Sequence, residues 1–427
     1  MKSSKRMLCQ AVAVALSVMA ASAVMAQSVP ALVGGGSSLV APSIGAEIAA
    51  FGTSQANISY SSVGSGKGQA GFLNNDPTQF GLPASAAPVD FANSDSALST
   101  TQLNSYASGA LSAVDGPLIE VPYIVTPITI PLVNAPVGTG PQTTTGQAHS
   151  VALNDADLCG IFSGKLTNWN QVINPDNNSA YAAGPITVVV RQDSSGTTDL
   201  LTRHLAAVCT TGASGNSAIA FTETQTFAAT EFAAGLPANF VQASGSSGVA
   251  NQLKTFATAG TAAVGYLSPD YTNSFLAPSS TAPAASNALP VASLVNANNP
   301  GTDVVPTYAN ASLALSNYAP PIAANASYQA QWIPNAAAPA SGYPISGTSN
   351  IILSQCYANS AAQSALVNFL NNHYTGASFA SIIHGNGFDT VPASYQTAIV
   401  ANFLSNTSGN YLDIGDSGIC TAPVTGR

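Results

Sequence analysis

The stretch RQDSSGTT, residues 191–198, indicates the fold most directly. It follows the apolar run ITVVV at 186–190, which predicts a buried strand, and it precedes DLLTRHLAAV at 199–208, which has the apolar spacing of a helix. A strand, a short Ser/Gly/Thr loop and a helix together build an anion site, because the first N–H groups of the helix lack partners and carry partial positive charge. In such a site Arg191 would offer a planar fork to two oxygens of one tetrahedral anion.

The same stretch also fits a simpler interpretation, in which Ser194 or Ser195 caps a helix that follows an arginine. Under the anion-site interpretation, Ser195 and Thr197 add hydroxyl donors, and Gly196 lets the backbone approach the ligand closely. Taken alone, the stretch favours neither interpretation.

Three other segments show the same combination of small residues before an expected helix. GGGSSL at 34–39 places a glycine loop in front of a helix, although a flexible start of the mature chain fits equally well. VGSGKG at 63–68 follows an expected strand and offers Ser65 as a donor. VDFANSDSAL at 89–98 places Asp95 in a Ser/Asn turn, where a lone aspartate is more often a helix cap.

The segment at 63–68 is not a P-loop. Ser61 stands where the first glycine of that motif belongs, and Gly68 stands where Ser or Thr should bind magnesium. A loop that offers N–H and hydroxyl donors around Ser65 is what remains.

Charge is scarce in this chain of 427 residues, which has nine Lys and Arg, 18 Asp and Glu, and a formal net charge of −9. Residues 1–26 predict a cleaved secretory signal, with Lys2, Lys5 and Arg6 before an apolar core and a small-residue site at Ala26. That core is too short for a transmembrane helix. Cleavage leaves six basic against 18 acidic residues, a net charge of −12. This excludes a nucleic-acid partner, which needs a basic footprint.

Four cysteines remain after cleavage, and an even number in an exported chain predicts two disulfides. The sequence leaves their connectivity open. Cys159–Cys209 with Cys356–Cys420 is the simplest pairing, and these spacings do not match a zinc site. The four histidines show no metal-ligand spacing either, and we interpret each of them as a surface or capping residue.

Apolar runs alternate with Gly/Ser/Asn loops, which predicts an α/β protein, and about 400 mature residues predict two lobes. The runs at 118–125 and 127–133 predict a strand that crosses between the lobes, interrupted by its prolines. We expect residues 135–150 to be a surface insertion and residues 272–340 to be irregular with a few strands. Further expected elements are a strand at 348–353 and helices at 361–372 and 394–404.

The four loops, in this order, resemble the phosphate-binding proteins of bacterial phosphate ABC transporters, and most closely their DING-type branch. The resemblance covers nearly the whole mature chain and includes the segments LCGIFSGKLTNW at 158–169, GSSGV at 245–249, VGYLSPD at 264–270, GYPI at 342–345 and SQCYAN at 354–359. Two departures are the replacement of the family's Asp-Ile-Asn by Ala31-Leu32-Val33 and of its threonine by Ser38, which keeps the hydroxyl.

The resemblance implies a set of phosphate contacts and one supporting residue. Asp193 would hold the arginine in place, and Asp95 would accept a hydrogen bond from a protonated phosphate oxygen while repelling sulfate. The contacts implied are Ser38, Leu39, Ser65, Asp95, Arg191, Ser195, Gly196 and Thr197. The resemblance implies no catalytic residue, no metal and no cofactor.

The implied fold is the two-lobed periplasmic-binding-protein fold of type II, with hinge-linked lobes and the ligand in the cleft. Residues 27–128 with 341–427 would form the first lobe, and residues 129–340 the second. Each predicted disulfide then lies within one lobe, so that neither would tether a hinge motion.

The implied function is high-affinity binding of inorganic phosphate for uptake by an ABC transporter, by a monomeric periplasmic or secreted protein whose further partner is the transporter permease. A second hypothesis is weak phosphomonoesterase (alkaline phosphatase) activity, with which some DING-type proteins are linked. Such chemistry needs a nucleophile with a base, or two metals, and the loops contain Ser and one Asp without a nearby His. A third hypothesis, a secreted adhesive protein, rests only on low charge and on richness in Ser, Thr and Asn.

Overall fold

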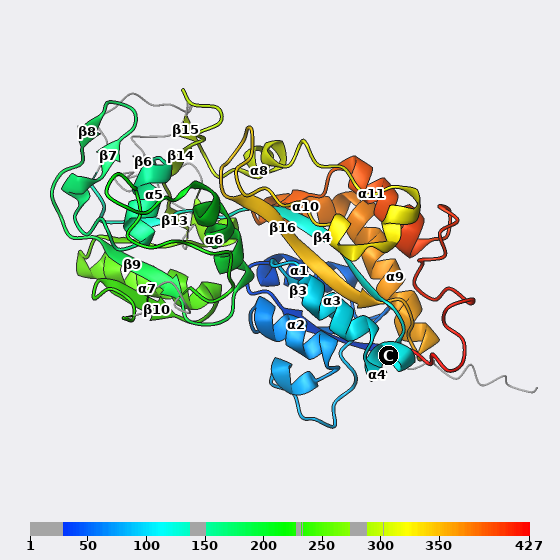
Figure 1. The fold of residues 1–427 in the computed structure, drawn as a ribbon. Helices are drawn as coiled ribbons and strands as arrows, with labels where there is room; N and C mark the ends of the chain where they lie inside the picture. The colour runs from blue at the N-terminus through cyan, green and yellow to red at the C-terminus, as the bar shows by residue number, and fades with distance from the viewer. Residues whose placement is uncertain (1–28, 137–150, 228–231, 233, 274–287, 302) are drawn as a thin grey trace, which may run out of the picture.

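A computed structural model describes residues 29–136, 151–227, 232, 234–273, 288–301 and 303–427. The predicted signal segment 1–26 and most of the predicted insertion 135–150 lie outside these residues. Figure 1 shows two lobes, one coloured green and the other blue, cyan, orange and red. Among the described residues, no helix is long and apolar enough to cross a membrane.

The larger lobe is built on a six-stranded sheet of order β17-β4-β16-β3-β1-β2. Its strands β1, β2 and β3 run parallel, whereas β16 and β17 pair antiparallel with their neighbours. The strands are β1 (Ala31–Gly36), β2 (Asn57–Ser62), β3 (Phe91–Ser94), β4 (Leu118–Pro127), β16 (Ser346–Ser354) and β17 (Asp389–Thr390). The helices are α1 (Ala41–Phe51), α2 (Ser65–Leu73), α3 (Thr100–Ala107), α4 (Ala110–Asp115), α9 (Ser360–Thr375), α10 (Ala377–Gly385) and α11 (Ala393–Ile399).

The smaller lobe is built on a four-stranded sheet of order β10-β9-β11-β5, in which β9 runs parallel to both β10 and β11. The strands are β5 (Leu132–Val133), β9 (Thr187–Arg191), β10 (Phe240–Ala243) and β11 (Ala263–Val264), and the helices are α5 (Asp155–Phe162), α6 (Gly196–Val208) and α7 (Gly245–Ala259). Short pairings complete the lobe: β6 (Ala152–Leu153) with β14 (Ser293–Val295) and β15 (Asp303–Val304), β7 (Ile173–Asn174) with β8 (Ser179–Ala180), and β12 (Thr272–Asn273) with β13 (Leu289–Pro290). The β-branched run of β9 is buried, as its composition predicts.

The chain passes from the larger to the smaller lobe directly after β4, where Thr129 bridges to Leu267 before β5 enters the smaller sheet. The crossing and its interruption were predicted: β4 ends at Pro127, and Pro131 lies in an isolated bridge before β5, although the strand continues through Pro122. Pro122 is tolerated because the edge strand β17 pairs with β4 only at Ile124 and Val125. The opposite neighbour, β16, shifts its register next to Pro122.

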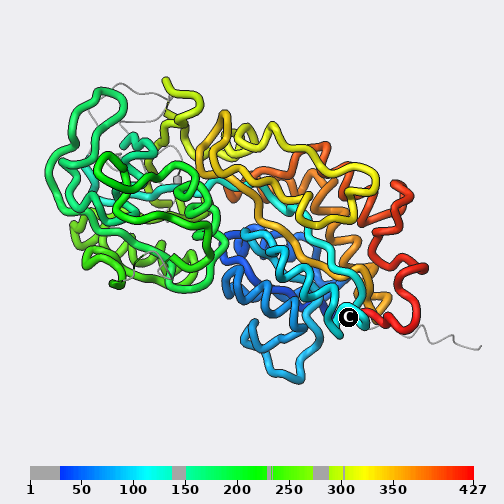
Figure 2. The backbone as a smooth tube through the Cα atoms, in the orientation of Figure 1, coloured from blue at the N-terminus to red at the C-terminus, as the bar shows by residue number. Residues whose placement is uncertain are grey.

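The tube in Figure 2 shows that both ends of the described chain, blue and red, lie in the larger lobe. The predicted lobe limits stay a prediction, and we propose moving the second limit from 340 to about 305. Helix α8 (Tyr308–Ala314) packs against β4, β16 and β17, and its Ser312 hydroxyl donates to Asp389 of β17 at 2.5 Å. Trp332 lies in the larger lobe against Phe403, at 5.1 Å between ring centroids. The stretch predicted as irregular thus contains a helix that belongs with the larger sheet.

The glycines at 34–36 do not form the loop that the sequence suggested, because all three lie in strand β1. A Cβ at Gly34 would come within 2.1 Å of the Phe91 ring, and a Cβ at Gly36 would come equally close to the Asn93 carbonyl oxygen. The glycines therefore serve close packing of β3 against β1, and the loop before α1 begins only at Ser37.

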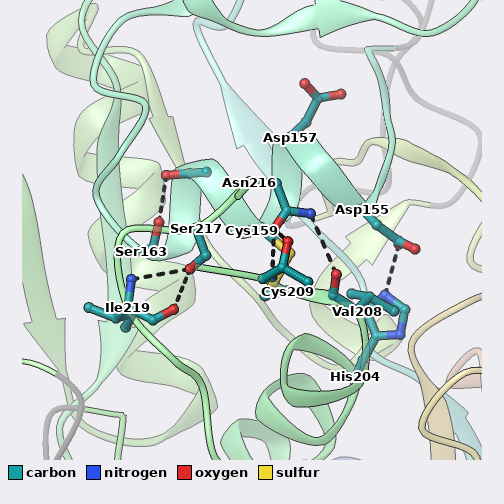
Figure 3. The surroundings of a disulfide bond; sticks show 12 residues. Asp155, Asp157, Cys159, Ser163, His204, Val208, Cys209, Asn216, Ser217 and Ile219 are labelled. Atoms are coloured by element: carbon teal, nitrogen blue, oxygen red, sulfur yellow. Dashed lines mark hydrogen bonds and ion pairs between the residues drawn. A yellow bond between two sulfur atoms is a disulfide. The ribbon is translucent and has the colours of Figure 1, made fainter. Parts of the chain in front are cut away.

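Both predicted disulfides are confirmed, Cys159–Cys209 in the smaller lobe and Cys356–Cys420 in the larger. Figure 3 shows the first, which ties α5 to the C-terminal end of α6. Since neither bridge crosses between the lobes, neither restrains their relative movement.

Two histidines contradict the interpretation of all four as surface or capping residues. His204 is buried, and one ring nitrogen contacts Asp155 at 3.0 Å (Figure 3). The other ring nitrogen lies 2.8 Å from the Ala337 carbonyl oxygen. His373 is buried against Glu47 and stacks on Tyr123. These contacts fix helices to the core. A sequence cannot show them because the partners come from distant segments.

The three arginines of the described residues are all buried. Arg203 pairs with Asp199 and Glu223, at 3.0 Å each. Arg427 lies over the Phe72 ring and donates to the carbonyl oxygens of Phe72 and Val89. Arg191, the third arginine, lies where the two lobes meet.

Candidate functional site

The candidate site lies where the carboxyl ends of two sets of parallel strands meet. Strands β1, β2 and β3 of the larger lobe lead into Ser38, Ser65 and Asp95, and β9 of the smaller lobe ends at Arg191. Ligands of open α/β sheets bind beyond the carboxyl ends of parallel strands. Helices α1, α2, α6 and α7 also begin here, and their first N–H groups present partial positive charge.

Arg191 is the cation of this site, and its orientation is fixed by Asp193. Its Nε donates to Asp193 Oδ1 at 2.8 Å and its Nη2 to Oδ2 at 2.5 Å, while Asp193 also accepts the N–H of Gly245. Burial opposes the ionisation of Asp193, but the guanidinium and this N–H together lower the pKa of the carboxyl below its usual value. One edge of the guanidinium is thereby used, and the edge formed by Nη1 and Nη2 faces the other lobe.

Across the cleft, that outer edge meets Ser38. Arg191 Nη2 donates to Ser38 Oγ at 3.1 Å, and Nη1 donates to Ser246 Oγ at 3.3 Å. The N–H of Ser246 donates to Ser38 Oγ at 3.2 Å, and the two serine hydroxyls are 3.1 Å apart. All three side chains are buried, so water competes little for these contacts.

Asp95 is the buried carboxylate of the site. Its Oδ1 accepts the Ser37 hydroxyl at 2.6 Å and its Oδ2 accepts the Ser65 hydroxyl at 3.4 Å, while its own N–H donates to Ser65 Oγ. Burial raises the pKa of the Asp95 carboxyl above its usual value, and the Ser37 hydroxyl and the Arg191 charge act in the opposite direction. The pattern of accepted bonds is that of a carboxylate used as an acceptor.

The start of α6 adjoins this carboxylate from the smaller lobe. A Cβ at Gly196 would lie 2.5 Å from Ser65 Oγ and 2.6 Å from Asp95 Cβ, so only glycine permits this approach. Ser195 caps the helix by accepting the Thr198 N–H, which leaves its own proton free to donate. The Thr197 hydroxyl is buried, and no partner for it is found among the described residues.

Two further contacts cross the cleft near its rim. The N–H of Gly66 donates to the Ser194 carbonyl oxygen at 3.3 Å, and Gln225 Nε2 donates to Gln69 Oε1 at 3.1 Å. With the Ser38 contacts, they show the two lobes in a closed arrangement.

The structure thus brings all the residues of the predicted set to one place, where two lobes meet. The Leu39 N–H is held by the hydroxyl of Ser37, at 3.1 Å. Sequence reasoning missed Ser37, Ser246 and Tyr266, whose hydroxyl accepts the Arg191 N–H at 2.9 Å. Ser246 had a usable signal, because it stands in the same strand, Gly/Ser loop and helix pattern as the predicted loops.

A second buried carboxyl group, that of Asp270, interacts electrostatically with Asp95. Burial raises its pKa to about 8, and the charge of Asp95 adds to this. Its Oδ1 has no hydrogen-bond partner within the described ranges. Those ranges contain no group of three or more His, Cys, Asp or Glu that could hold a metal ion.

A family model described as a PBP superfamily domain matches residues 21–370. The chain belongs to this superfamily. Within it, the chain is 35% identical to the solved structure of a high-affinity periplasmic phosphate-binding protein of DING type bound with phosphate, with a TM-score of 0.74 over 93% of this chain and 99% of that one. The resemblance to DING-type phosphate-binding proteins and the two-lobed fold are therefore confirmed.

Two curated relatives carry different names. The chain is 38% identical to "Alkaline phosphatase L" of Pseudomonas aeruginosa strain UCBPP-PA14, over 84% of this chain and 86% of the relative. It is 36% identical to a "Phosphate-binding protein" of an unknown prokaryotic organism, over 84% of this chain and 91% of the relative. These names describe those two proteins.

Proposed function

We propose that this protein binds inorganic phosphate with high affinity and delivers it for uptake by an ABC transporter. The observation that carries the proposal is the orientation of Arg191: Asp193 holds the guanidinium so that its outer edge, formed by Nη1 and Nη2, faces Ser38 of the other lobe. A guanidinium, several hydroxyls and the first N–H groups of α6 offer the donors that a tetrahedral oxyanion requires.

Asp95 favours phosphate over a fully deprotonated anion such as sulfate. Near neutral pH phosphate keeps at least one proton, which a buried carboxylate can accept, whereas sulfate has no proton to offer. Sulfate would place its charge against the Asp95 carboxylate without a compensating hydrogen bond, and burial makes that repulsion strong.

The first test is calorimetry on protein that has been freed of phosphate by exhaustive dialysis. We expect a saturable heat with one phosphate per chain, and an increase in melting temperature with phosphate concentration, because a ligand that binds only the folded state must stabilise it. Sulfate at the same concentration is the control. Absence of both heat and stabilisation by phosphate would contradict the proposed function.

We also propose that the protein works outside the cytoplasm, after cleavage near Ala26, as a monomer that docks on a transporter permease. Two disulfides in a chain with ample apolar core support an oxidising compartment. N-terminal sequencing of the exported protein tests the cleavage, which should remove about the first 26 residues. Sedimentation of the same protein tests its oligomeric state, which should be a monomer.

Weak phosphomonoesterase activity is the second candidate, and two observations favour keeping it. One is the name of the phosphatase relative, and the other is the Ser37 hydroxyl, which donates to Asp95 at 2.6 Å as a nucleophile would to a base. If this chain is an enzyme, turnover of p-nitrophenyl phosphate should co-purify with the protein and disappear in Ser37→Ala. Activity that separates from the protein, or that survives this substitution, removes the candidate.

A further inference from the structure

We propose that Ser246, on the first turn of α7, is a positioning residue that fixes the Ser38 hydroxyl and the Arg191 guanidinium when the lobes close, and so slows the release of the anion. The inference rests on the proposed function and deepens it. It assigns a role to a fifth loop, one that follows β10 and lies outside the four loops of the predicted contact set.

The hydrogen bonds of Ser38 set the direction of its proton. Its Oγ accepts from Arg191 Nη2 at 3.1 Å and from the Ser246 N–H at 3.2 Å. A hydroxyl oxygen has two lone pairs, so both are used, and Ser38 can only donate its proton. A free serine hydroxyl can donate or accept a hydrogen bond. The two donors of the smaller lobe leave Ser38 only the role of donor, and an anion requires a donor.

Ser246 Oγ completes the cluster. It accepts from Arg191 Nη1 at 3.3 Å and lies 3.1 Å from Ser38 Oγ. The two hydroxyls carry two protons, and Ser38 has no lone pair left, so at most one proton is used between them. The cluster keeps one O–H donor in a buried place, and an anion oxygen is the acceptor that would satisfy it.

The first turn of α7 also acts on the other partner of Arg191. The Gly245 N–H donates to Asp193 Oδ1 at 2.8 Å, next to the bond from Arg191 Nε to the same oxygen. One helix start thus holds Asp193, Arg191 and Ser38 at once, and the contact to Ser38 crosses between the lobes. Opening of the cleft breaks the contacts of both Arg191 and Ser246 to Ser38 in one step.

The test compares Ser246→Ala with Ser247→Ala. Ser247 lies on the same helix turn but is exposed, and it is a matched control. We expect Ser246→Ala to weaken phosphate binding about tenfold, mainly through faster dissociation in stopped-flow measurements, because a hydrogen bond to a charged group is lost. Ser247→Ala should bind like wild type, and the melting temperature without phosphate should stay close to wild type in both. Ser246→Thr, which keeps the hydroxyl, should restore part of the binding.

A double-mutant cycle with Ser38→Ala separates a positioning role from direct contact. Ser246→Ala removes Oγ but keeps the backbone N–H that donates to Ser38. If Ser246 Oγ acts partly through Ser38, its loss should cost less in the Ser38→Ala background than in wild type, because the contact to Ser38 Oγ is already absent while the contact to Arg191 Nη1 remains. Equal losses in both backgrounds, or unchanged dissociation in Ser246→Ala, would overturn the inference. Failure of wild type itself to bind phosphate would instead overturn the proposed function, so the two failures are distinguishable.

Discussion

Arg191→Ala is expected to weaken phosphate binding by about 10²- to 10⁴-fold, the largest effect of any single substitution in the site. With Nε and Nη2 bonded to Asp193, Nη2 to Ser38 and Nη1 to Ser246, one Nη1 proton is left to give the anion a charge-assisted hydrogen bond. The substitution also removes the contact of the charge to Ser38 across the cleft, and each of these two bonds is worth about 1.5–3 kcal/mol. The other edge of the guanidinium is held by Asp193, so the loss falls on the edge that faces the cleft. Titration calorimetry of the variant beside wild type measures the loss directly.

Two further variants make this result interpretable. Arg191→Ala leaves Asp193 without its ion-pair partner, so the variant with both residues changed to Ala shows whether repulsion from Asp193 contributes. Arg191→Lys keeps the charge and loses the planar fork, and intermediate affinity is expected. Melting temperatures of all three must show a folded protein. Binding by Arg191→Ala within threefold of wild type would contradict the role of the arginine.

Asp95→Asn is expected to lower the discrimination between phosphate and sulfate by on the order of 10²-fold, and to lower phosphate affinity by much less. The amide removes the negative charge that repels sulfate and adds N–H donors beside Ser37 and Ser65. Competition titrations, in which sulfate displaces bound phosphate, measure the ratio of the two affinities in the variant and in wild type.

Asp90 supplies a matched control for this experiment. It is a buried aspartate just before the same strand β3, at the end opposite Asp95, and it accepts the Val33 N–H at 2.7 Å. Asp90→Asn should leave the discrimination as it is in wild type. If sulfate still does not displace phosphate from Asp95→Asn, Asp95 is not the acceptor of the phosphate proton. The proposed reason for the preference for phosphate over sulfate then fails.

The local patterns of the sequence predicted much of this structure. Strand β9 and helix α6 were predicted from the runs on either side of 191–198, and the predicted helix at 361–372 lies within α9. Small residues between a strand and a helix also marked the loops that meet at the cleft. These features are local, because periodicity and loop chemistry depend on neighbouring residues.

What could not be predicted depends on contacts between distant segments. Ser38 and Ser246 are 208 positions apart, and no local signal shows that their hydroxyls meet. The glycines of β1 looked like a loop, because their close packing on β3 is a tertiary contact. Pro122 looked like an interruption, because the sequence does not show that one side of β4 lacks a neighbouring strand there. The burial of His373 depends in the same way on Glu47, 326 positions away.

The burial of Arg191, Arg203 and Arg427, the arginines of the described residues, has a consequence for how phosphate reaches the protein. With Arg191, Arg203 and Arg427 enclosed, the described surface keeps Lys67, Lys165 and Lys254 against an excess of carboxylates. Long-range electrostatic steering therefore opposes the approach of an anion, and attraction begins only within the short reach of the cleft. Added salt shortens the Debye length to about 10 Å at 0.1 M and screens the outer repulsion. Phosphate should therefore associate faster as ionic strength rises, the reverse of what a basic surface would give.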